Sequence, residues 1–299
     1  MVNGDAGGGD RLALAVLAQH RMATTQQVHL MISPTVRIEQ TRRRLVKLRT
    51  EGLIDRVTLP QAGRTRVWFV THYGAEVASR WPELRDWRPP RLAADRTAAR
   101  LRVGHALVVT ETALAFVQDA RRHGDVCQPL DWIPEVYHSP LTRERRGPHT
   151  RCPAVLPTPG QGQGWVVNAA GVRGGRPGHH GPERLAAKIS AYERLYRHVP
   201  SVVGRPRPGS ELPVEEWRRR YPVFPRVLFV LDGTGPTGID NRISALHAGA
   251  KFAHIDFLRG VPMLAAPLND LLRGGPSAPV WRPVTDPGQQ VSWTDSLRG

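Results

Sequence analysis

The sequence of 299 residues has little lysine, little cysteine and no long apolar run. Only three of its 42 basic residues are lysines (Lys47, Lys188 and Lys251), and the others are arginines. Two cysteines, Cys127 and Cys152, are too few for a disulfide framework or a cysteine-based zinc site. No stretch approaches the roughly 18 consecutive apolar residues of a membrane-spanning helix, and the beginning lacks the basic and apolar regions of a signal peptide. We therefore expect a cytoplasmic protein without a membrane partner.

Acidic residues are also scarce, which leaves a large excess of positive charge. The 26 Asp and Glu residues oppose 42 Lys and Arg residues, so the formal net charge is +16. A charge of this size points to a polyanionic partner, with nucleic acid as the first class and an anionic membrane surface as the second. The length is too great for one compact core and suits two domains.

The first part of the sequence shows the pattern of a winged helix-turn-helix. Apolar periodicity and capping residues predict three helices, and the third begins at the Ser33-Pro34 signature and ends at Gly52. Two short strand patterns joined by a polar, glycine-bearing turn then predict a hairpin, which a further helix closes. The predicted elements are helices at about 10–21, 34–51 and 73–80 and strands at 53–59 and 66–71. The second helix lies between the first two of these helices; Thr24 or Thr25 caps it, and Val28, Leu30, Met31 and Ile32 supply its apolar residues.

The helix predicted at 34–51 is the candidate DNA-reading element. Apolar and small residues at spacings of three and four (Ile38, Thr41, Leu45 and Leu48) form its buried stripe. The second helix of a helix-turn-helix enters the major groove, where Arg pairs with guanine and Gln with adenine. We expect one outward face made of Arg37, Gln40, Arg44 and Lys47, phosphate contacts from Arg42, Arg43 and Arg49, and backbone or minor-groove contacts from Arg64 and Arg66 on the wing.

Two other interpretations of this basic helix stay open. A charge-rich helix face is often only solvated, and winged helices also serve as protein-interaction modules. Because the motif and the charge occur together, double-stranded DNA is the favoured partner.

The second part of the sequence predicts an α/β layer domain. A long helix is followed by strand patterns near 132–137, 155–156, 165–167 and 227–231, with helices at 182–197 and 240–250 between or after them. We expect a flexible tail at 1–9, the winged helix-turn-helix at 10–81, a proline-rich linker at 82–91, the α/β domain at 92–258 and an irregular C-terminal tail at 259–299.

Several segments together resemble the replication-relaxation family of actinobacterial chromosomes and plasmids. They are LAVLAQHRMATTQQVHLMI, TRRRLVKLRTEGLIDRV, VWFVTHYGAEVA, RVGHALVVTETALAFV, LDWIPEVYHS, GPERLAAKISAYERLY and FPRVLFVLDG, in that order. The resemblance covers most of residues 10–290. It implies a winged helix joined to a restriction-endonuclease-like α/β domain, a link to replication or mobilisation of a plasmid or mobile element, and association with a nucleoid or plasmid. A homodimer, or replication and mobilisation proteins, are further partners that it implies.

The sequence departs from this family where metal-binding carboxylates are expected. Family members resemble Phe-Val-Glu-Val-Asp-Arg-Ala-Thr-Met ahead of the Gly-Pro-Glu-Arg motif, whereas this chain has VRGGRPGHH there, and no Asp or Glu occurs from Arg146 to His180. In such nucleases carboxylates hold the Mg²⁺ that activates water. We therefore expect no catalytic residue, no metal site and no cofactor, with Lys188 on the next helix as a possible phosphate contact. Asp131, Glu135, Asp232 and Asp240 flank predicted strands, but no pair of them has motif spacing.

A one-base shift of the reading frame accounts for the missing motif. Read one base later, the codons of Gly174 to His180 permit Glu-Val-Asp-Arg-Ala-Thr-Met in that order. Our hypothesis is that about residues 147–180 are translated out of frame between two compensating indels, so that this segment packs poorly. The competing interpretation is a Gly/Pro-rich loop insertion.

The function that the sequence favours is DNA binding by a chain whose nuclease-like domain is catalytically inactive. The alternatives are an active metal-dependent DNA nickase, a winged-helix transcriptional regulator without nuclease ancestry, and a protein-interaction scaffold.

Overall fold

The structure is a computed structural model of the whole chain. It describes residues 8–59, 63–84, 96–131, 133–138, 150–156, 165–170, 182–199, 214–219, 221, 223–232 and 235–295. The chain divides into two compact units, Met1–Pro134 and Glu135–Gly299. None of the described helices combines the length and the apolar character that a membrane span requires.

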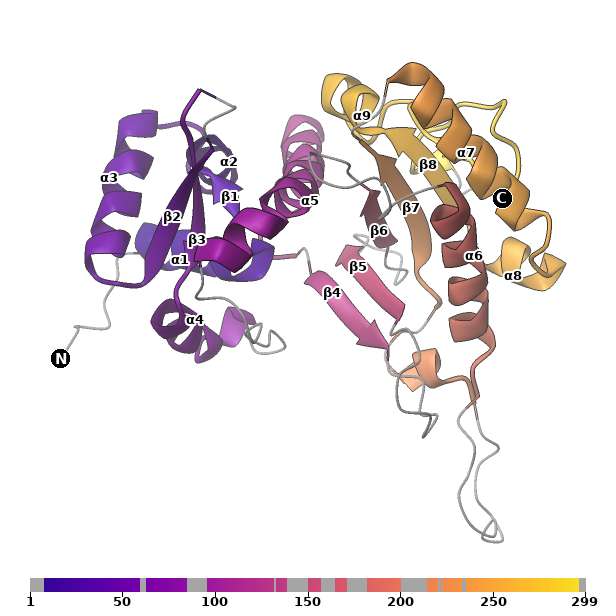
Figure 1. The fold of residues 1–299 in the computed structure, drawn as a ribbon, viewed down its shortest axis with the longest axis horizontal. Helices are drawn as coiled ribbons and strands as arrows, with labels where there is room; N and C mark the ends of the chain where they lie inside the picture. The colour runs from indigo at the N-terminus through magenta and orange to yellow at the C-terminus, as the bar shows by residue number, and fades with distance from the viewer. Residues whose placement is uncertain are drawn as a thin grey trace, which may run out of the picture. The chain divides into compact units, whose positions relative to one another are not determined.

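The first unit is a winged helix-turn-helix with one additional long helix (Figure 1). Its strands form an antiparallel sheet in the order β1-β3-β2, in which β2 and β3 are the hairpin of the wing. This strand order, together with three preceding helices, confirms the predicted fold of this part. The elements are α1 (Gly8–His20), β1 (Ala23–Thr24), α2 (Thr25–Ile32), α3 (Ile38–Thr50), β2 (Ile54–Leu59), β3 (Thr65–Val70), α4 (His72–Ser79), the 3-10 helix η2 (Pro82–Leu84) and α5 (Arg96–His123).

Capping residues fix the ends of the helices around the helix-turn-helix. Thr24 and Gln27 form a capping box before α2, because each side chain accepts a hydrogen bond from the backbone N–H of the other residue. Helix α3 begins at Ile38, later than the sequence predicted, since residues 34–37 form a turn and an extended residue ahead of it. The helix ends where Gly52 adopts a φ of 74° and Leu53 N–H donates to the carbonyl of Leu48.

Helix α5 packs on the winged helix, whereas the sequence pattern placed it in the second domain. One face of the sheet carries an apolar cluster of Val57, Val67 and Phe69, and Val103 of α5 covers it. Polar contacts hold the helix in place: Thr110 Oγ1 donates to the carbonyl of Met22 at 2.7 Å, and Arg121 donates to the carbonyls of Leu30 and Met31 at the end of α2. An uncovered apolar sheet face would be unfavourable in water, so α5 completes this unit.

The second unit is a mixed α/β structure with a six-stranded sheet in the order β4-β5-β6-β7-β8-β9. Strands β6, β7 and β8 are parallel, while β5 and β9 are antiparallel to their neighbours β6 and β8. The elements are β4 (Ile133–His138), β5 (Thr150–Leu156), β6 (Trp165–Ala170), α6 (Pro182–Arg197), the 3-10 helix η3 (Glu216–Arg219), β7 (Arg226–Leu231), α7 (Pro236–Ala250), α8 (Ile255–Gly260), β8 (Met263–Pro267), α9 (Leu268–Gly274) and β9 (Arg282–Pro283). This confirms the mixed α/β class.

Strand β7 is buried along its whole length, as its continuous apolar pattern predicted. Helices α6 and α7 cover one face of it, where Ile189 and Leu246 belong to the same apolar cluster as Phe229. The two helices lie so close that a Cβ atom on Gly249 would stand 2.9 Å from the Cα of Ala186. Glycine is therefore required at this crossing for packing reasons.

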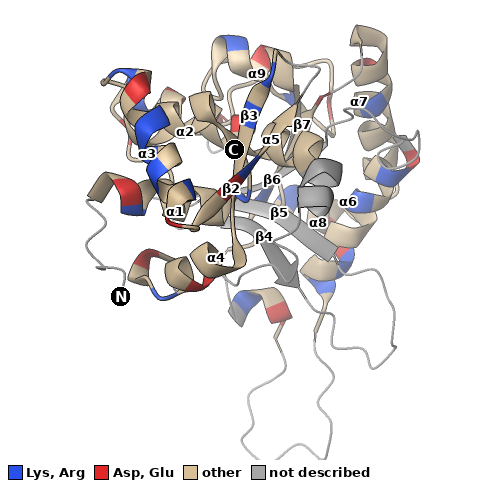
Figure 2. Cartoon of the chain, turned by 60° about the vertical axis from the view of Figure 1, so that its left-hand side comes forward, with Lys and Arg blue, Asp and Glu red and all other residues tan. Residues whose placement is uncertain are grey.

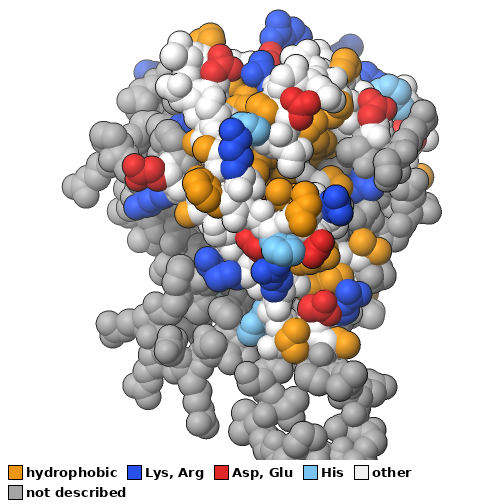
Figure 3. Space-filling model, turned by 90° about the vertical axis from the view of Figure 1, so that its right-hand side faces the viewer, with side chains coloured by type: hydrophobic (Ala, Val, Ile, Leu, Met, Phe, Trp, Pro, Cys, Tyr) orange, Lys and Arg blue, Asp and Glu red, His pale blue; other side chains and the backbone are white. Residues whose placement is uncertain are grey.

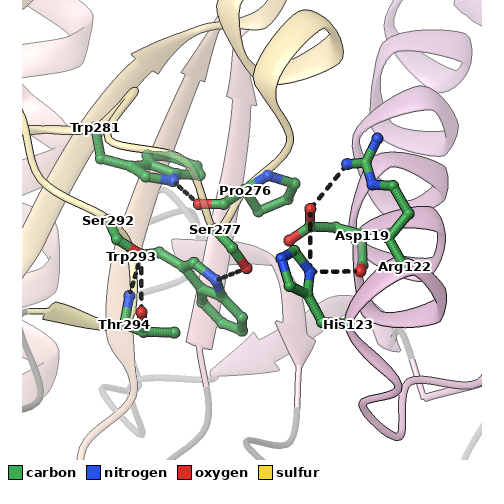
Figure 4. Close-up of polar contacts among 9 residues, drawn as sticks. All are labelled: Asp119, Arg122, His123, Pro276, Ser277, Trp281, Ser292, Trp293 and Thr294. Carbon is green, nitrogen blue, oxygen red and sulfur yellow. Dashed lines mark hydrogen bonds and ion pairs between the residues drawn. The ribbon is translucent and has the colours of Figure 1, made fainter.

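The segment after α8 is folded, although the sequence predicted an irregular tail from residue 259. Strand β8 pairs with β7, and Trp281 is fully buried with its indole N–H donating to the carbonyl of Pro276 at 2.8 Å. The indole N–H of Trp293 reaches the hydroxyl of Ser277 at 3.4 Å (Figure 4). Frequent Pro and Gly interrupt the apolar periodicity here, so the local pattern hides a segment that tryptophans anchor to the sheet.

Two strands form within the segment that the frame hypothesis concerns. The strands predicted near 155–156 and 165–167 are present as β5 and β6, and β6 pairs with β7 over six residues. The seven residues Gly174 to His180, which carry the frame argument, lie outside the described residues.

Candidate nucleic-acid interface

Helix α3 is amphipathic, and its inner side packs on the rest of the winged helix. Of the four residues predicted for its buried stripe, Thr41, Leu45 and Leu48 are fully buried, whereas Ile38 at the start of the helix is only partly buried. The hydroxyl of Thr41 lies 3.0 Å from Nδ1 of His29, which ties α3 to α2 through a buried hydrogen bond. The opposite side of the helix is therefore held at a fixed angle toward solvent.

The predicted interface residues lie mostly on the surface. Those that are exposed are Arg37, Gln40, Arg42, Arg43, Lys47 and Arg49 around α3 and Arg64 and Arg66 on the wing. Arg44 is only partly exposed. Figure 2 shows, in blue on the ribbon, that basic residues occur along α3 and on the strands of the wing.

Arg44 and Lys47 face α1, which corrects the expectation that they share an outward face with Arg37 and Gln40. Arg44 Nε lies 2.8 Å from Oδ1 of Asp10, and Lys47 Nζ lies 2.7 Å from Oδ2 of the same carboxylate. Asp10 stands in the first turn of α1. It lies far from Arg44 and Lys47 in the sequence, so the periodicity of α3 could not reveal this contact.

The carboxylate of Asp10 stays charged in this arrangement. Its partial burial acts to raise the pKa, but the hydrogen bonds from Lys47 and Arg44 outweigh the burial and hold the pKa below its ordinary value. The same hydrogen bond raises the pKa of Lys47. One acid therefore partly neutralises two of the cations that the sequence predicted for DNA binding.

Two further arginines make exposed ion pairs. Arg42 lies 3.0 Å from Glu39 one turn earlier on α3, and Arg49 lies 3.1 Å from Asp55 on β2. Exposed pairs of this kind contribute little stability, about 0–1 kcal/mol, so a phosphate can replace the carboxylate at small cost.

The outward face of α3 centres on Arg43, Val46 and Thr50, which are all exposed and stand at spacings of three and four residues. Four arginines on this side of the unit make no ion pair with any residue that the structure describes, and they are Arg37, Arg43, Arg64 and Arg66. Arg64 follows Gly63 in the hairpin turn, and both adopt a φ of 60°. Such a left-handed turn is costly for a non-glycine residue, and here it holds Arg64 at the exposed tip of the wing.

A hollow of about 300 Å³ lies between α3 and the wing, and the sequence alone did not reveal it. Its lining includes Val46, Arg49 and Thr50 from α3, Asp55 and Arg56 from β2, and Trp68 from β3. The guanidinium of Arg56 lies 5.6 Å from the centre of the Trp68 ring. The signal that could have found it is the hairpin register, since Arg56 and Trp68 are direct cross-strand partners.

The second unit brings none of its candidate residues together into a metal site. Within the described ranges, no three His, Cys, Asp or Glu residues lie close enough to hold a metal ion. Lys188 lies partly buried on α6. Asp131 lies in the first unit, where its carboxylate accepts a hydrogen bond from the backbone of Gln128 in a turn. Asp232 follows β7 and its carbonyl accepts from Arg242, while Asp240 pairs with Arg282 at 3.2 Å. The side chain of Glu135 is outside the described part.

The visible surface of α6, α7 and α8 differs from that of α3. Figure 3 shows basic, acidic and hydrophobic side chains interspersed over this face of the second unit. Charges of both signs mixed in this way are typical of an ordinary solvated surface and carry no field of one sign.

Fold and surface together define a winged-helix protein that carries an additional mixed α/β unit. The family model described as replication-relaxation matches residues 14–202, which is more than half of the chain. The chain belongs to the replication-relaxation family.

Comparison with solved structures finds short winged-helix matches. A variant of MarR from E. coli in complex with operator DNA is 20% identical, with 25% of this chain and 52% of that chain covered and a TM-score of 0.23. A variant of ZitR from Lactococcus lactis is 19% identical, with 24% and 48% covered and a TM-score of 0.22. The chain thus spans about half the length of these relatives. No curated protein matches the chain.

Proposed function

We propose that this protein binds double-stranded DNA through α3 and the β2–β3 wing. The observation that carries the proposal is the set of four arginines on that side (Arg37, Arg43, Arg64 and Arg66) that meet no acidic partner among the described residues. Phosphates of a DNA backbone supply the missing negative charge and release counterions when they are bound. Membership of the replication-relaxation family supports a task on DNA.

More specifically, we propose that the protein acts in the replication or mobilisation of a plasmid or other mobile element, and that it is located on the nucleoid or plasmid. We assign most contacts of this interface to DNA phosphates, because most of the exposed residues on α3 and the wing that we expect to bind DNA are arginines. Base reading is assigned to Arg37 and Gln40, which stand just before α3 and in its first turn, whereas Arg43 is assigned to a phosphate. Arg44 and Lys47 contribute less than their charge suggests, since Asp10 holds both.

The test is the salt dependence of binding to a labelled duplex of about 25 base pairs, measured by fluorescence anisotropy. Removal of one phosphate-binding cation flattens the slope of log affinity against log salt by roughly 0.9. We expect Arg43→Ala and Arg66→Ala each to flatten the slope by about that amount. Arg80→Ala is the matched control, because Arg80 ends α4 with an exposed side chain that pairs with Glu76. Slopes equal to the control for both variants would contradict the proposal and favour a protein-interaction scaffold.

The same assay separates a transcriptional regulator from the proposed role. A regulator would bind one operator at least about a thousandfold tighter than unrelated DNA. We expect a much smaller preference, because phosphate contacts are independent of sequence. A single strongly preferred site in a selection from random duplexes would support the regulator instead.

We further propose that the restriction-endonuclease-like unit implied by the family resemblance does not cleave DNA in this chain. The proposal is supported by the complete lack of Asp and Glu from Arg146 to His180. Metal-dependent hydrolysis of a phosphodiester needs carboxylates at the metal. Incubation of supercoiled plasmid with the pure protein and Mg²⁺ or Mn²⁺ is expected to leave it intact. Nicking that a chelator abolishes would show that the site lies elsewhere, and Asp131 and Glu135 would be the first residues to replace.

A further inference from the structure

The hollow between α3 and the wing has an unbalanced charge. Two guanidinium groups, those of Arg49 and Arg56, line it together with one carboxylate, that of Asp55. That carboxylate is bonded to Arg49 at 3.1 Å. Arg56 makes no hydrogen bond or ion pair with any residue of the described ranges and contacts the ring of Trp68 instead. The hollow is therefore one anion short of neutrality.

The position of Arg56 is electrostatically unfavourable in the absence of a bound anion. Desolvation lowers the pKa of Arg56, and repulsion by Arg66 and Arg49 lowers it further, while Asp55 compensates only in part. Three arginines thus lie near one another on the wing and at the end of α3. Such a group is stabilised when an anion with several acceptor oxygens is placed among its members.

The hollow opens on the face of α3 that we assign to DNA. Val46 and Thr50 line it, and the same two residues form the outward stripe of α3 with Arg43. Any duplex that contacts Arg43 therefore passes the mouth of the hollow. Val46 is 51% exposed, so this part of the lining is open to solvent.

The size and walls of the hollow fit more than a phosphate alone. The hollow has a volume of about 300 Å³, which is the liquid volume of about ten water molecules. A phosphate group has only five heavy atoms and would leave part of this volume unfilled. The remaining wall is apolar or carries hydroxyl groups, from Val46, Ile54 and Thr50. A deoxyribose ring offers matching apolar and hydrogen-bonding edges.

We propose that the hollow between α3 and the wing holds one sugar-phosphate unit of the bound DNA backbone, with Arg56 as the residue that binds the phosphate. This inference rests on the DNA binding proposed above. It adds Arg56 to the interface and fixes the side of α3 along which one DNA strand passes.

The first experiment compares Arg56→Ala, Arg56→Lys, Arg43→Ala and the control Arg80→Ala in the anisotropy assay. A slope contribution of 0.9 corresponds to roughly an eightfold affinity at 0.1 M salt. We therefore expect Arg56→Ala to bind about eightfold more weakly and Arg56→Lys to keep most of the slope, because the charge remains. If Arg56→Ala matches the control while Arg43→Ala binds more weakly, the hollow is not a phosphate site and the DNA-binding proposal stands. If neither variant differs from the control, the DNA-binding proposal itself fails.

A second variant keeps the proposal testable if Arg56→Ala does not fold. Val46→Trp fills the mouth of the hollow without removing a charge, and Val46 is exposed enough to accept the larger ring. Arg56→Met removes the charge but keeps an unbranched side chain that can cover Trp68. Because both changes act on the same site, Val46→Trp and Arg56→Met combined should weaken binding no more than the stronger of the two alone. Effects that multiply would place the two residues in separate contacts and overturn the inference.

A calorimetric titration distinguishes the backbone from a free ligand. Deoxyribose 5-phosphate and inorganic phosphate are titrated into the wild type and Arg56→Ala. We expect no saturable binding of either at micromolar concentration, because the neighbouring DNA contacts that hold the unit in place are missing. Micromolar binding of deoxyribose 5-phosphate that needs Arg56, with DNA affinity independent of Arg56, would assign the hollow to a free sugar phosphate and refute the backbone inference.

Discussion

Replacing Asp10 by Asn should strengthen DNA binding, although Asp10 belongs to α1 and not to the proposed interface. Its carboxylate holds Arg44 at 2.8 Å and Lys47 at 2.7 Å, and its side chain is 14% exposed. The amide of Asn keeps an oxygen that can accept one of these hydrogen bonds, but it carries no charge to neutralise the two cations. Arg44 and Lys47 then become available to phosphates on either side of α3.

The size of the effect follows from the number of cations released. If both reach a phosphate, the slope of log affinity against log salt steepens by up to about 1.8, which is roughly sixtyfold in affinity at 0.1 M salt. Arg44 is the less exposed of the two cations. If only Lys47 reaches a phosphate, the affinity for DNA increases roughly eightfold. The protein should also become less stable, because Arg44 loses the charged partner of a hydrogen bond that is shielded from water.

Anisotropy titrations between 50 mM and 300 mM salt measure this change, and Glu76→Gln serves as the matched control. Glu76 lies on α4 and pairs with Arg80, so the control makes the same change in net charge away from α3. An increase in affinity for Asp10→Asn that equals the increase for the control would show a general charge effect. Weaker binding by a variant that still folds would refute the reasoning, because it would mean that Asp10 positions the two side chains for DNA.

Three further predictions concern stability and the gene. His20 is fully buried and desolvation lowers its pKa to about 4, although the backbone contact with Pro129 acts to raise it. Stability should therefore be constant above pH 6.5 and fall by roughly 3 kcal/mol as the pH drops to 4, a decrease that urea unfolding of His20→Gln should no longer show. Gly249→Val should lower the free energy of unfolding by about 1–3 kcal/mol, because the larger side chain forces α6 and α7 apart. Ala248→Val, on the exposed side of α7, should leave the free energy of unfolding nearly unchanged. Equal losses of stability in the two variants would contradict the close packing. Sequencing codons 174–180 should find GGA at Gly174, GGT at Gly175, CGA at Arg176 and CAT at His180, and codons ending in G or C at Gly174 and Arg176 would end the frame hypothesis.

Local signals predicted the helix boundaries where capping chemistry is explicit. The sequence left the cap of the second helix open between Thr24 and Thr25, and Thr24 is the cap, where it closes a capping box with Gln27. Helix α6 covers the predicted 182–197, with Pro182 at its first position. The two strands of the wing and the burial of β7 followed in the same way from short apolar patterns. These features depend on residues that are neighbours in the sequence.

Features that depend on distant residues escaped prediction. The C-terminal strand β8 is short and ends at Pro267, so only its pairing with β7 makes it a strand. Helix α5 follows a proline-rich stretch that resembles a domain linker, yet its hydrogen bonds to Met22 and to the end of α2 join it to the winged helix. The sequence analysis did not single out Arg56, because only the pairing of β2 with β3 places it against Trp68.

The predicted face of α3 shows why composition matters for the site. Periodicity identified Thr41, Leu45 and Leu48 as the buried positions of the helix, but it placed Arg44 on the outward face and treated all the cations as equivalent. The cations are not equivalent, because the chain has only 26 acidic residues for 42 basic ones. A cation that pairs with one of these few acids is less available to bind phosphate than a cation without an acidic partner. Asp10 withdraws Arg44 and Lys47, and Asp55 holds Arg49 at the mouth of the hollow. Arg43 and Arg56 have no acid within bonding distance in the described structure, so under the function proposed above they are the cations that meet the DNA backbone first.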